Sequence, residues 1–264
     1  MKRVMMIAVF ALLSVCVFAQ TVGEKVYKEV SVNGEMVSKW LQVSRTEEYD
    51  SMGNRIHFKN SAGAENWTEY DSKGNIIHSK WSYGSEEWNE YDSMGNKIYT
   101  KYKGYKDNAK VDYEKWYEYD SKGNMIHSKR SDGVEEWCEY DKKGNMIHSK
   151  LNNGFEEWNE YDSKGNRIHS KRSNGVEEWW EYDKKGNKIH HKGTNISDER
   201  WEYDSNGNEI LYKIGTGLGI QYWYEYDSKG NMIHLRQNGG YEVWYEYTFW
   251  DNGNVKTLIG YEKF

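Results

Sequence analysis

The sequence has 264 residues, a formal net charge of −6, no proline, two cysteines and an aromatic content of 16%. Its acidic balance excludes the basic surfaces through which proteins bind nucleic acids and anionic membranes. Because aliphatic residues are few while Trp and Tyr are abundant, we expect a core built from aromatic rings.

The first residues have the features of a secretory signal peptide. Lys2 and Arg3 precede an apolar run from Val4 to Val17, and the small residue Ala19 stands before Gln20. We expect cleavage after Ala19 and a mature chain that is secreted, periplasmic or on the cell surface. Removal of Lys2 and Arg3 leaves 34 basic against 42 acidic residues, a net charge of −8.

A lipoprotein is the alternative for this segment. Leu13 to Cys16 is weakly similar to a lipoprotein cleavage site, although Val15 is bulkier than the small residue expected there. With cleavage after Ala19 the mature chain keeps only Cys138, so no intrachain disulfide is expected. The apolar run is too short for a spanning helix and no other stretch qualifies, so no transmembrane segment is predicted.

Most of the remaining sequence repeats one unit about ten times. The unit reads E-E-W-x-E-Y-D-x-x-G-N-x-I-H-S-K, and most copies are 21 residues apart. A Gly interrupts every ten residues or so, which excludes a helical period and predicts hairpins. The repeat glycines that follow the Asp are Gly53, Gly74, Gly95, Gly123, Gly144, Gly165, Gly186, Gly207, Gly230 and Gly253.

The turn residues predict how the strands pair. Asn-Gly and Asp-Gly pairs such as Asn153-Gly154 suit two-residue type I′ turns, and each D-x-x-G-N suits a three-residue loop. With one two-residue loop and one three-residue loop in each 21-residue repeat, equivalent side chains stay on the same face of the sheet from one repeat to the next. This register places Trp137 opposite Ser149 and Tyr140 opposite Met146, with the His residues on the Tyr face.

We therefore predict an all-β fold, a long antiparallel β-hairpin meander that forms a single coiled sheet or partial shell. Open sheets rarely pass about ten strands without curling, so we expect one aromatic row to turn inward. The predicted divisions are a signal peptide (1–19), an N-terminal capping hairpin (20–46), the repeats (47–254) and a C-terminal capping strand (255–264). Such repeats are stabilised by their neighbours.

Three places depart from the regular repeat. Residues 102–115 contain seven extra positions, for which we expect a longer hairpin loop. Residues 214–221 add two more positions. Trp201 stands one residue late, so it falls on the Tyr face unless a nearby bulge restores the register.

The recurring Y-D-x-x-G-N with a preceding Trp or Tyr resembles the YD repeats, also called RHS repeats. The resemblance covers residues 47–254, and Tyr140-Asp141, Gly144-Asn145 and Ile147 follow the family's order. It implies hairpin sheets that spiral into shells, in a secreted or surface setting. Two features differ: Asn follows the Gly where the family favours Arg, and the sequence ends at Phe264, whereas large members of the family carry a toxin or protease segment after the repeats.

Two other hairpin families are similar to parts of the chain. The segment from Trp223 to Ile233 looks like the aromatic hairpins of choline-binding and other cell-wall-binding repeats, which form ligand cages. MORN-type repeats are a third possibility for the architecture. If the chain binds a partner, we expect one that is itself extended or repetitive, such as a glycan, wall polymer or surface protein.

The residues that usually carry chemistry are periodic here and lie apart. Equivalent His residues are expected about 9.6 Å apart, two strands along the sheet, whereas zinc needs its ligands about 2 Å from one point. Asp204 to Glu209 has calcium-loop composition without the distant bidentate Glu. No unique set of nucleophile and base stands out. We predict no metal, no cofactor and no enzymatic activity.

The aromatic rows have two interpretations. They form the packed inner face of the sheet, or one row stays exposed and binds a partner, since Tyr and Trp are enriched at interfaces. The predicted function is binding at the cell envelope or outside the cell; the alternatives are a self-associating scaffold that uses its sheet edges and a cell-wall or glycan-binding module. The candidate surface is Trp67, Trp88, Trp116, Trp137, Trp158, Trp179, Tyr140, Tyr161, Tyr182, His148 and His169.

Overall fold

The computed structural model describes residues 21–32, 35–106, 109–217 and 219–263, and the predicted signal peptide and Cys16 lie outside them. Within these residues, no helix has the length and apolar character needed to cross a membrane. The described chain forms antiparallel strands, in the order β1(Lys25–Val32), β2(Glu35–Tyr49), β3(Arg55–Asn60), β4(Glu65–Tyr70), β5(Ile76–Trp81), β6(Glu86–Tyr91), β7(Lys97–Lys106), β8(Ala109–Tyr119), β9(Met125–Arg130), β10(Glu135–Tyr140), β11(Met146–Leu151), β12(Glu156–Tyr161), β13(Arg167–Arg172), β14(Glu177–Tyr182), β15(Lys188–Gly193), β16(Ile196–Tyr203), β17(Glu209–Ile214), β18(Ile220–Tyr226), β19(Met232–Gln237), β20(Glu242–Phe249) and β21(Val255–Glu262).

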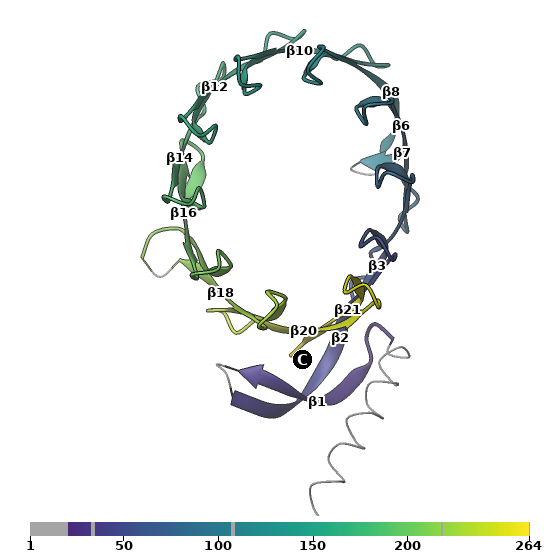
Figure 1. The fold of residues 1–264 in the computed structure, drawn as a ribbon, viewed down its shortest axis with the longest axis vertical. Coiled ribbons are helices and arrows are strands. Elements are labelled where there is room, and N and C mark those ends of the chain that lie inside the picture. The colour runs from purple at the N-terminus through teal and green to yellow at the C-terminus, as the bar shows by residue number, and fades with distance from the viewer. Residues whose placement is uncertain (1–20, 33–34, 107–108, 218, 264) are drawn as a thin grey trace, which may run out of the picture.

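The sheet closes on itself, which corrects the expected open coiled sheet or partial shell (Figure 1). The last strand, β21, pairs with β2 from Gln42↔Glu262 to Glu48↔Thr257, while β2 also pairs with β3. The 21-stranded sheet therefore contains a ring of 20 strands, β2 to β21, with β1 outside it. Closure pairs the two edges that an open meander would leave exposed.

The β1–β2 hairpin lies outside the ring, against β20 and β21 (Figure 1). Its Val30 and Leu41 are buried with Trp244, Ile259 and Tyr261. Because β2 runs without interruption from the hairpin into the ring, the predicted division at residue 46 falls within one strand. The expected turn at residues 33–34 lies outside the described residues.

The turns differ from the prediction, and the difference resets the register. At Asn153-Gly154 the amide of Leu151 donates to the carbonyl of Phe155, and that of Gly154 donates to the carbonyl of Leu151, at 2.8 and 3.0 Å. The same pattern occurs at the Asp loops, as we call the D-x-x-G-N turns, so both turns are three-residue loops. A bulge beside each Asp loop supplies the odd residue, as between Glu139 and Tyr140. Bulges also bend the strands, which accounts for the curvature of the ring.

The observed register places Trp, His, Lys and Glu on one face and Tyr with the small residues on the other. Trp137 pairs with Lys150 and not with Ser149, and His148 pairs with Trp158. Trp244, which occupies the repeat's Trp position, packs under the external β1–β2 hairpin, so the Trp face is the outer wall. The expectation that these tryptophans form a packed inner face is therefore wrong.

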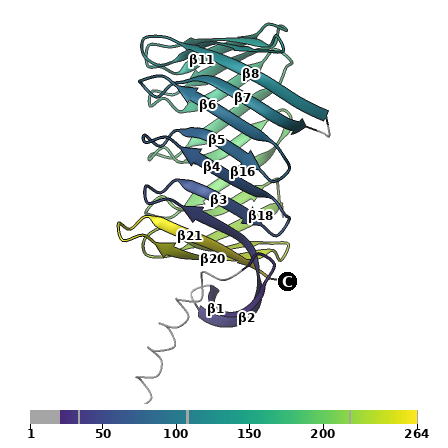
Figure 2. The same cartoon turned by 90° about the vertical axis from the view of Figure 1, so that its right-hand side faces the viewer.

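Two of the three irregular places are resolved by strand length and register. The extra residues near 102–115 lengthen β7 and β8 and do not form a longer loop, so this hairpin extends past the ring (Figure 2). Trp201 pairs with Tyr212 and lies two residues before Tyr203, on the Tyr face, as one of the two predicted outcomes requires. The second outcome, a bulge that restores Trp201 to the Trp face, does not occur.

Candidate functional site: the outer wall of the ring

The outer wall consists of cross-strand rows with a fixed order of side chains, here called wall rows. A complete wall row reads Glu–His–Trp–Lys–Glu across five neighbouring strands, and equivalent rows recur every two strands, about 9.6 Å apart. In one row Tyr99 replaces the His. A complete example is Glu139, His148, Trp158, Lys171 and Glu177.

Each histidine of these rows stacks on the tryptophan beside it. The ring centroids of His148 and Trp158 are 5.3 Å apart with an angle of 12° between the planes. Stacked aromatic pairs contribute about 0.5–1.5 kcal/mol beyond their buried area. The same pairing holds for His57–Trp67, His78–Trp88, His127–Trp137 and His169–Trp179.

Carboxylates and lysines complete the rows. His148 Nε2 lies 3.0 Å from Glu156 Oε2, and Lys150 Nζ lies 3.2 Å from the other oxygen of Glu156. Hydrogen bonds from Lys150 and then from His148 hold the pKa of Glu156 below its usual value. Glu139, on the other side of the imidazole, keeps 71% of its side chain exposed. The wall therefore presents largely exposed carboxylates beside less exposed ones, both next to the imidazole.

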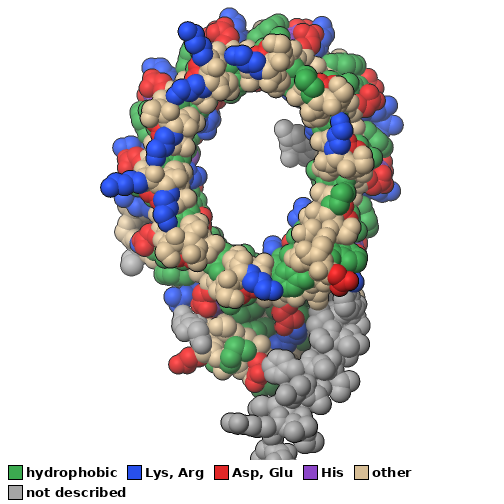
Figure 3. Space-filling model, in the orientation of Figure 1, with side chains coloured by type: hydrophobic (Ala, Val, Ile, Leu, Met, Phe, Trp, Pro, Cys, Tyr) green, Lys and Arg blue, Asp and Glu red, His purple; other side chains and the backbone are tan. Residues whose placement is uncertain are grey.

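The tryptophans remain partly accessible despite the stacking. Trp67, Trp116, Trp137, Trp158 and Trp179 are 37–44% exposed. The imidazole covers one face of the ring in every His–Trp pair, so the ring is open to solvent only in part. Figure 3 shows charged side chains around the outer perimeter with hydrophobic ones between them. Such a surface combines apolar contact with hydrogen-bonding groups.

The predicted candidate residues are divided between the two faces. The tryptophans, with His148 and His169, lie on the outer wall, whereas Tyr140, Tyr161 and Tyr182 lie on the inner wall. The Tyr161 hydroxyl donates to the carbonyl of Met146 at 2.8 Å. Met146 stands at the bulge, where the ladder is interrupted, so the tyrosine satisfies a carbonyl that would otherwise lack a strand partner. We assign these tyrosines to the fold.

The rest of the Y-D-x-x-G-N motif is also used by the fold. Asp141 Oδ1 accepts hydrogen bonds from the amides of Lys143 and Asn145, and its Oδ2 accepts from Asn145 Nδ2. Gly144 has a φ of +89°, a conformation that L side chains rarely adopt. Lys143 Nζ donates to the carbonyl of Ser163 in the next Asp loop at 2.9 Å. Such a lysine, here called a strap, ties neighbouring loops together.

An ion-pair network on the inner wall was not found from the sequence. Arg172 pairs with Glu157 and Glu178, each at 3.1 Å, and His191 pairs with Glu178 and Glu199 at 3.2 and 2.9 Å. The second Glu of each E-E-W and the replacements of the repeat's residues by Arg172 and His191 were the available signals. The centre of the ring is open in the space-filling view of the described residues (Figure 3).

Cys138 and the repeated acidic and histidine residues show no arrangement for redox or metal chemistry. Cys138 is buried on the inner wall, and burial raises the pKa of its thiol to about 11. A thiol of this kind is a poor nucleophile at neutral pH. Among residues 21–32, 35–106, 109–217 and 219–263, no group of three His, Cys, Asp or Glu side chains is placed to hold a metal ion.

No family model matches the chain. No curated protein matches it either. Among solved structures it is similar to TcdB2-TccC3-TEV, at 14% identity and a TM-score of 0.42, over 95% of this chain and 17% of that one. It is also similar to the Photorhabdus luminescens Tc holotoxin pore, at 12% identity and a TM-score of 0.42, over 89% of this chain and 18% of that one.

A porin-like protein from Bacteroides uniformis is also similar, at 9% identity and a TM-score of 0.39, over 84% of this chain and 96% of that one. The chain spans less than a fifth of the length of the toxin chains named above. At these TM-scores we base no conclusion on the likenesses, and membership of the YD-repeat family remains a resemblance of the motif.

Proposed function

We propose that the chain is an exported, non-catalytic scaffold whose outer wall binds an extended, repetitive partner, a glycan or wall polymer, at the cell envelope or outside the cell. The observation that carries the proposal is the regular recurrence of wall rows with partly exposed tryptophans. A partner with its own repeat can contact several rows at once, and such contacts add through effective concentration. The ionised Glu and Lys side chains suit an aqueous surface.

The different roles of the motif residues and of the outer tryptophans support this proposal. The Tyr, Asp, Gly and Asn of the motif are engaged in turns, bulges and loop contacts. The outer tryptophans lack such a role in holding the backbone, yet the repeat carries them at the same outward position in most copies. Glu139 and Glu160 lie beside His148 and His169 yet keep 71% and 70% of their side chains exposed, so their carboxylates have lone pairs that can accept hydrogen bonds from sugar hydroxyl groups.

Self-association through sheet edges has less support. The hypothesis requires free edges at the two ends of the sheet, but β2 and β21 pair with each other, and among the described strands only the short β1 keeps an edge without a strand partner. Ile259, where an introduced charge would test that hypothesis, is 5% exposed in the core under the β1–β2 hairpin. A change at Ile259 therefore tests ring closure and not an assembly edge.

The test is retention of purified residues 20–264 on insoluble cell walls and immobilised glycans. Wild-type protein should be depleted from solution in a saturable manner. The variant Trp137→Ala/Trp158→Ala should lose at least ten-fold in affinity, because two neighbouring rows lose their exposed rings. Tyr105→Ala, at an exposed tyrosine of the extended hairpin, is the matched control and should bind as wild type. Equal retention of all three proteins, or of none, would refute wall binding.

A further inference from the structure

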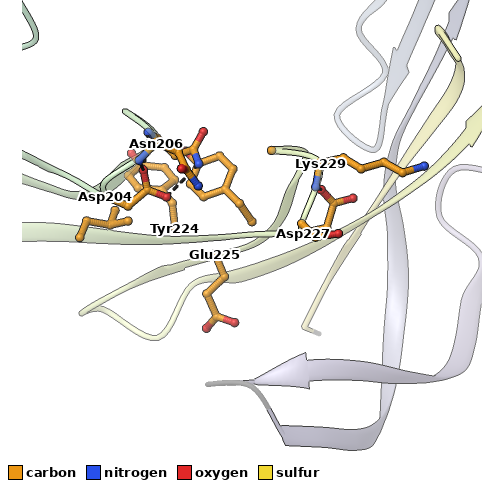
Figure 4. A pocket seen from close by; sticks show the side chains of 11 residues that line it. Asp204, Asn206, Tyr224, Glu225, Asp227 and Lys229 are labelled. Carbon is orange, nitrogen blue, oxygen red and sulfur yellow. Dashed lines mark hydrogen bonds between the residues drawn. The ribbon is translucent and has the colours of Figure 1, made fainter. Parts of the chain in front are cut away.

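A polar groove opens at the ring's rim between two Asp loops, residues 204–208 and 227–231. Asp204, Asn206 and Asn208 line one side of the groove, and Asp227 lines the other, with Tyr224 between them. Figure 4 shows Asp204, Asn206 and Tyr224 grouped together, Asp227 and Lys229 across from them, and Glu225 directed away. The groove belongs to the rim and not to the wall rows.

The groove differs from its neighbour in lacking a strap, since the equivalent groove between the loops at 183–187 and 204–208 is crossed by Lys185. In three preceding loops the residue before the glycine is a lysine whose Nζ donates to the next loop, from Lys143 to Ser163, from Lys164 to Lys184 and from Lys185 to Ser205, at 2.8–2.9 Å. The next loop has Asn206 at this position, and its side chain is too short to span the gap. The repeat is also 23 residues long here and not 21.

The side chains around the gap leave hydrogen-bonding capacity unused. The Asn206 amide makes no hydrogen bond within the described residues, whereas its backbone amide donates to Asp204 Oδ1 at 2.8 Å. A side-chain hydrogen bond from Asn208 keeps the pKa of Asp204 below its usual value, so this carboxylate is ionised at neutral pH and has lone pairs to spare. Tyr224 adds a partly exposed aromatic ring.

We propose that this groove binds one uncharged sugar ring, with the Tyr224 ring against its C–H face, the Asn206 amide bonded to one hydroxyl group and the Asp204 carboxylate accepting from another. An aromatic wall with a few convergent polar groups is the usual composition of a small-molecule site. The two ionised carboxylates of the flanking loops disfavour anionic ligands. The three proposed contact residues, Tyr224, Asn206 and Asp204, belong to no wall row, so the site can be tested apart from binding by the wall rows.

The decisive variant is Asn206→Lys, which supplies the missing strap. It removes the amide proposed to bond a sugar hydroxyl group and places an ammonium group across the groove, as Lys185 does in the neighbouring one, without lowering the melting temperature. Saturation-transfer NMR with methyl β-glucoside and methyl β-N-acetylglucosaminide is the measurement. We expect transfer from wild-type protein to at least one glycoside and a loss of at least five-fold in Asn206→Lys.

Two further variants separate this site from the wall and from folding. Tyr224→Phe keeps the ring and should keep binding, whereas Trp158→Ala should leave the NMR signal unchanged even if retention on polymers falls. The proposal is overturned if neither glycoside responds, if Asn206→Lys binds as wild type, or if only calcium chloride perturbs these residues.

Discussion

The arc from β9 to β14 and the arc from β15 to β20 differ in where their aromatic rings lie. In the first arc Trp137, Trp158 and Trp179 stand on the outer wall, stacked on histidines. In the second, Trp201 stacks on Tyr212 on the inner wall, with ring centroids 5.0 Å apart. Both arcs still form the Asp loops and the bulges beside them, whereas the turns between β15 and β16 and between β17 and β18 differ from those of the first arc.

The two arcs share the residues that form the ring, the loop Asp and the bulge Tyr, and differ in the position of the Trp. Tyr203 in the irregular arc donates to the carbonyl of Lys188 at 2.8 Å, as Tyr161 does to that of Met146 in the regular arc. The Tyr–bulge contact and the Asp loop are therefore enough to continue the ring. The ring tolerates the shifted Trp201, so the outward position of the other tryptophans is not required for closure, which is why we assign binding to them.

The largest effect is expected from a variant that prevents ring closure, on which both arcs depend. Ile259→Lys would bury a charge in the core beneath the β1–β2 hairpin, where Ile259 is 5% exposed. An uncompensated buried charge costs at least about 3–5 kcal/mol, so we expect a large fall in melting temperature and a greater radius of gyration by X-ray scattering. Thr257→Lys, in the same strand but partly exposed, is the control. Normal closure in Ile259→Lys would contradict the seam described here.

A smaller effect compares the Asp loops of the two arcs. Gly165→Ala and Gly207→Ala both place a side chain at positive φ, +89° and +92°, which costs about 1–3 kcal/mol. A Cβ at Gly165 would also lie 3.4 Å from Asn145 Oδ1, whereas one at Gly207 meets nothing within 4 Å. Urea unfolding should show both variants destabilised, with Gly165→Ala at least as affected. A neutral effect at both positions would refute the backbone argument.

The Tyr–bulge contact should contribute equally in both arcs. Tyr161→Phe and Tyr203→Phe each remove one hydroxyl and leave a bulge carbonyl without its donor, at a cost of about 1 kcal/mol. Tyr105→Phe, on an exposed ring, should change the free energy of unfolding very little. If Tyr161→Phe is as harmless as the control, the tyrosine is not needed to satisfy the bulge.

The stacked histidine and tryptophan of the regular arc should stabilise the fold jointly, with a measurable coupling energy. A double-mutant cycle on His148→Ala and Trp158→Ala should give a coupling of about 0.5–1 kcal/mol. The equivalent cross-strand pair in the irregular arc is His190 and Arg200, which has no stacked tryptophan. Its coupling energy should change with salt concentration, because Arg200 is charged, whereas that of His148 with Trp158 should change less. Zero coupling for His148 with Trp158 would mean that the stack is incidental.

The smallest effect per residue is the acid sensitivity of the Asp loops. Side-chain hydrogen bonds from Asn145 and Asn166 hold the pKa of Asp141 and Asp162 below the usual carboxyl value. Because the folded pKa is the lower one, this stabilisation is complete above the unfolded pKa near about 4 and is lost as the pH falls through the folded pKa. The melting temperature should therefore be flat above about pH 5 and fall below it. Asp141→Asn/Asp162→Asn should show a shallower fall, and an identical pH profile would contradict the assignment.

The sequence allowed the hairpin repeat and the strand positions to be predicted, because turn residues and alternation act locally, and it left two outcomes for Trp201, of which the Tyr face is observed. Closure could not be predicted, since it depends on small bends accumulated over twenty strands. The register was wrong by one residue because a bulge beside Tyr140 and a two-residue turn at Gly154 both account for an odd repeat. The observed bulge places His148 on the same face as the tryptophans, and this face is the outer wall.

The most direct test of wall binding is lysine footprinting with and without a bound wall polymer. Lys129, Lys150 and Lys171 lie in the wall rows with 52–58% of their side chains exposed, whereas Lys122 and Lys142 lie in the Asp loops at the rim. We predict that the polymer slows acetylation of the three wall lysines and leaves the two rim lysines unchanged. Protection of the rim lysines alone, or of neither set while the polymer is bound, would contradict the outer wall as the binding surface.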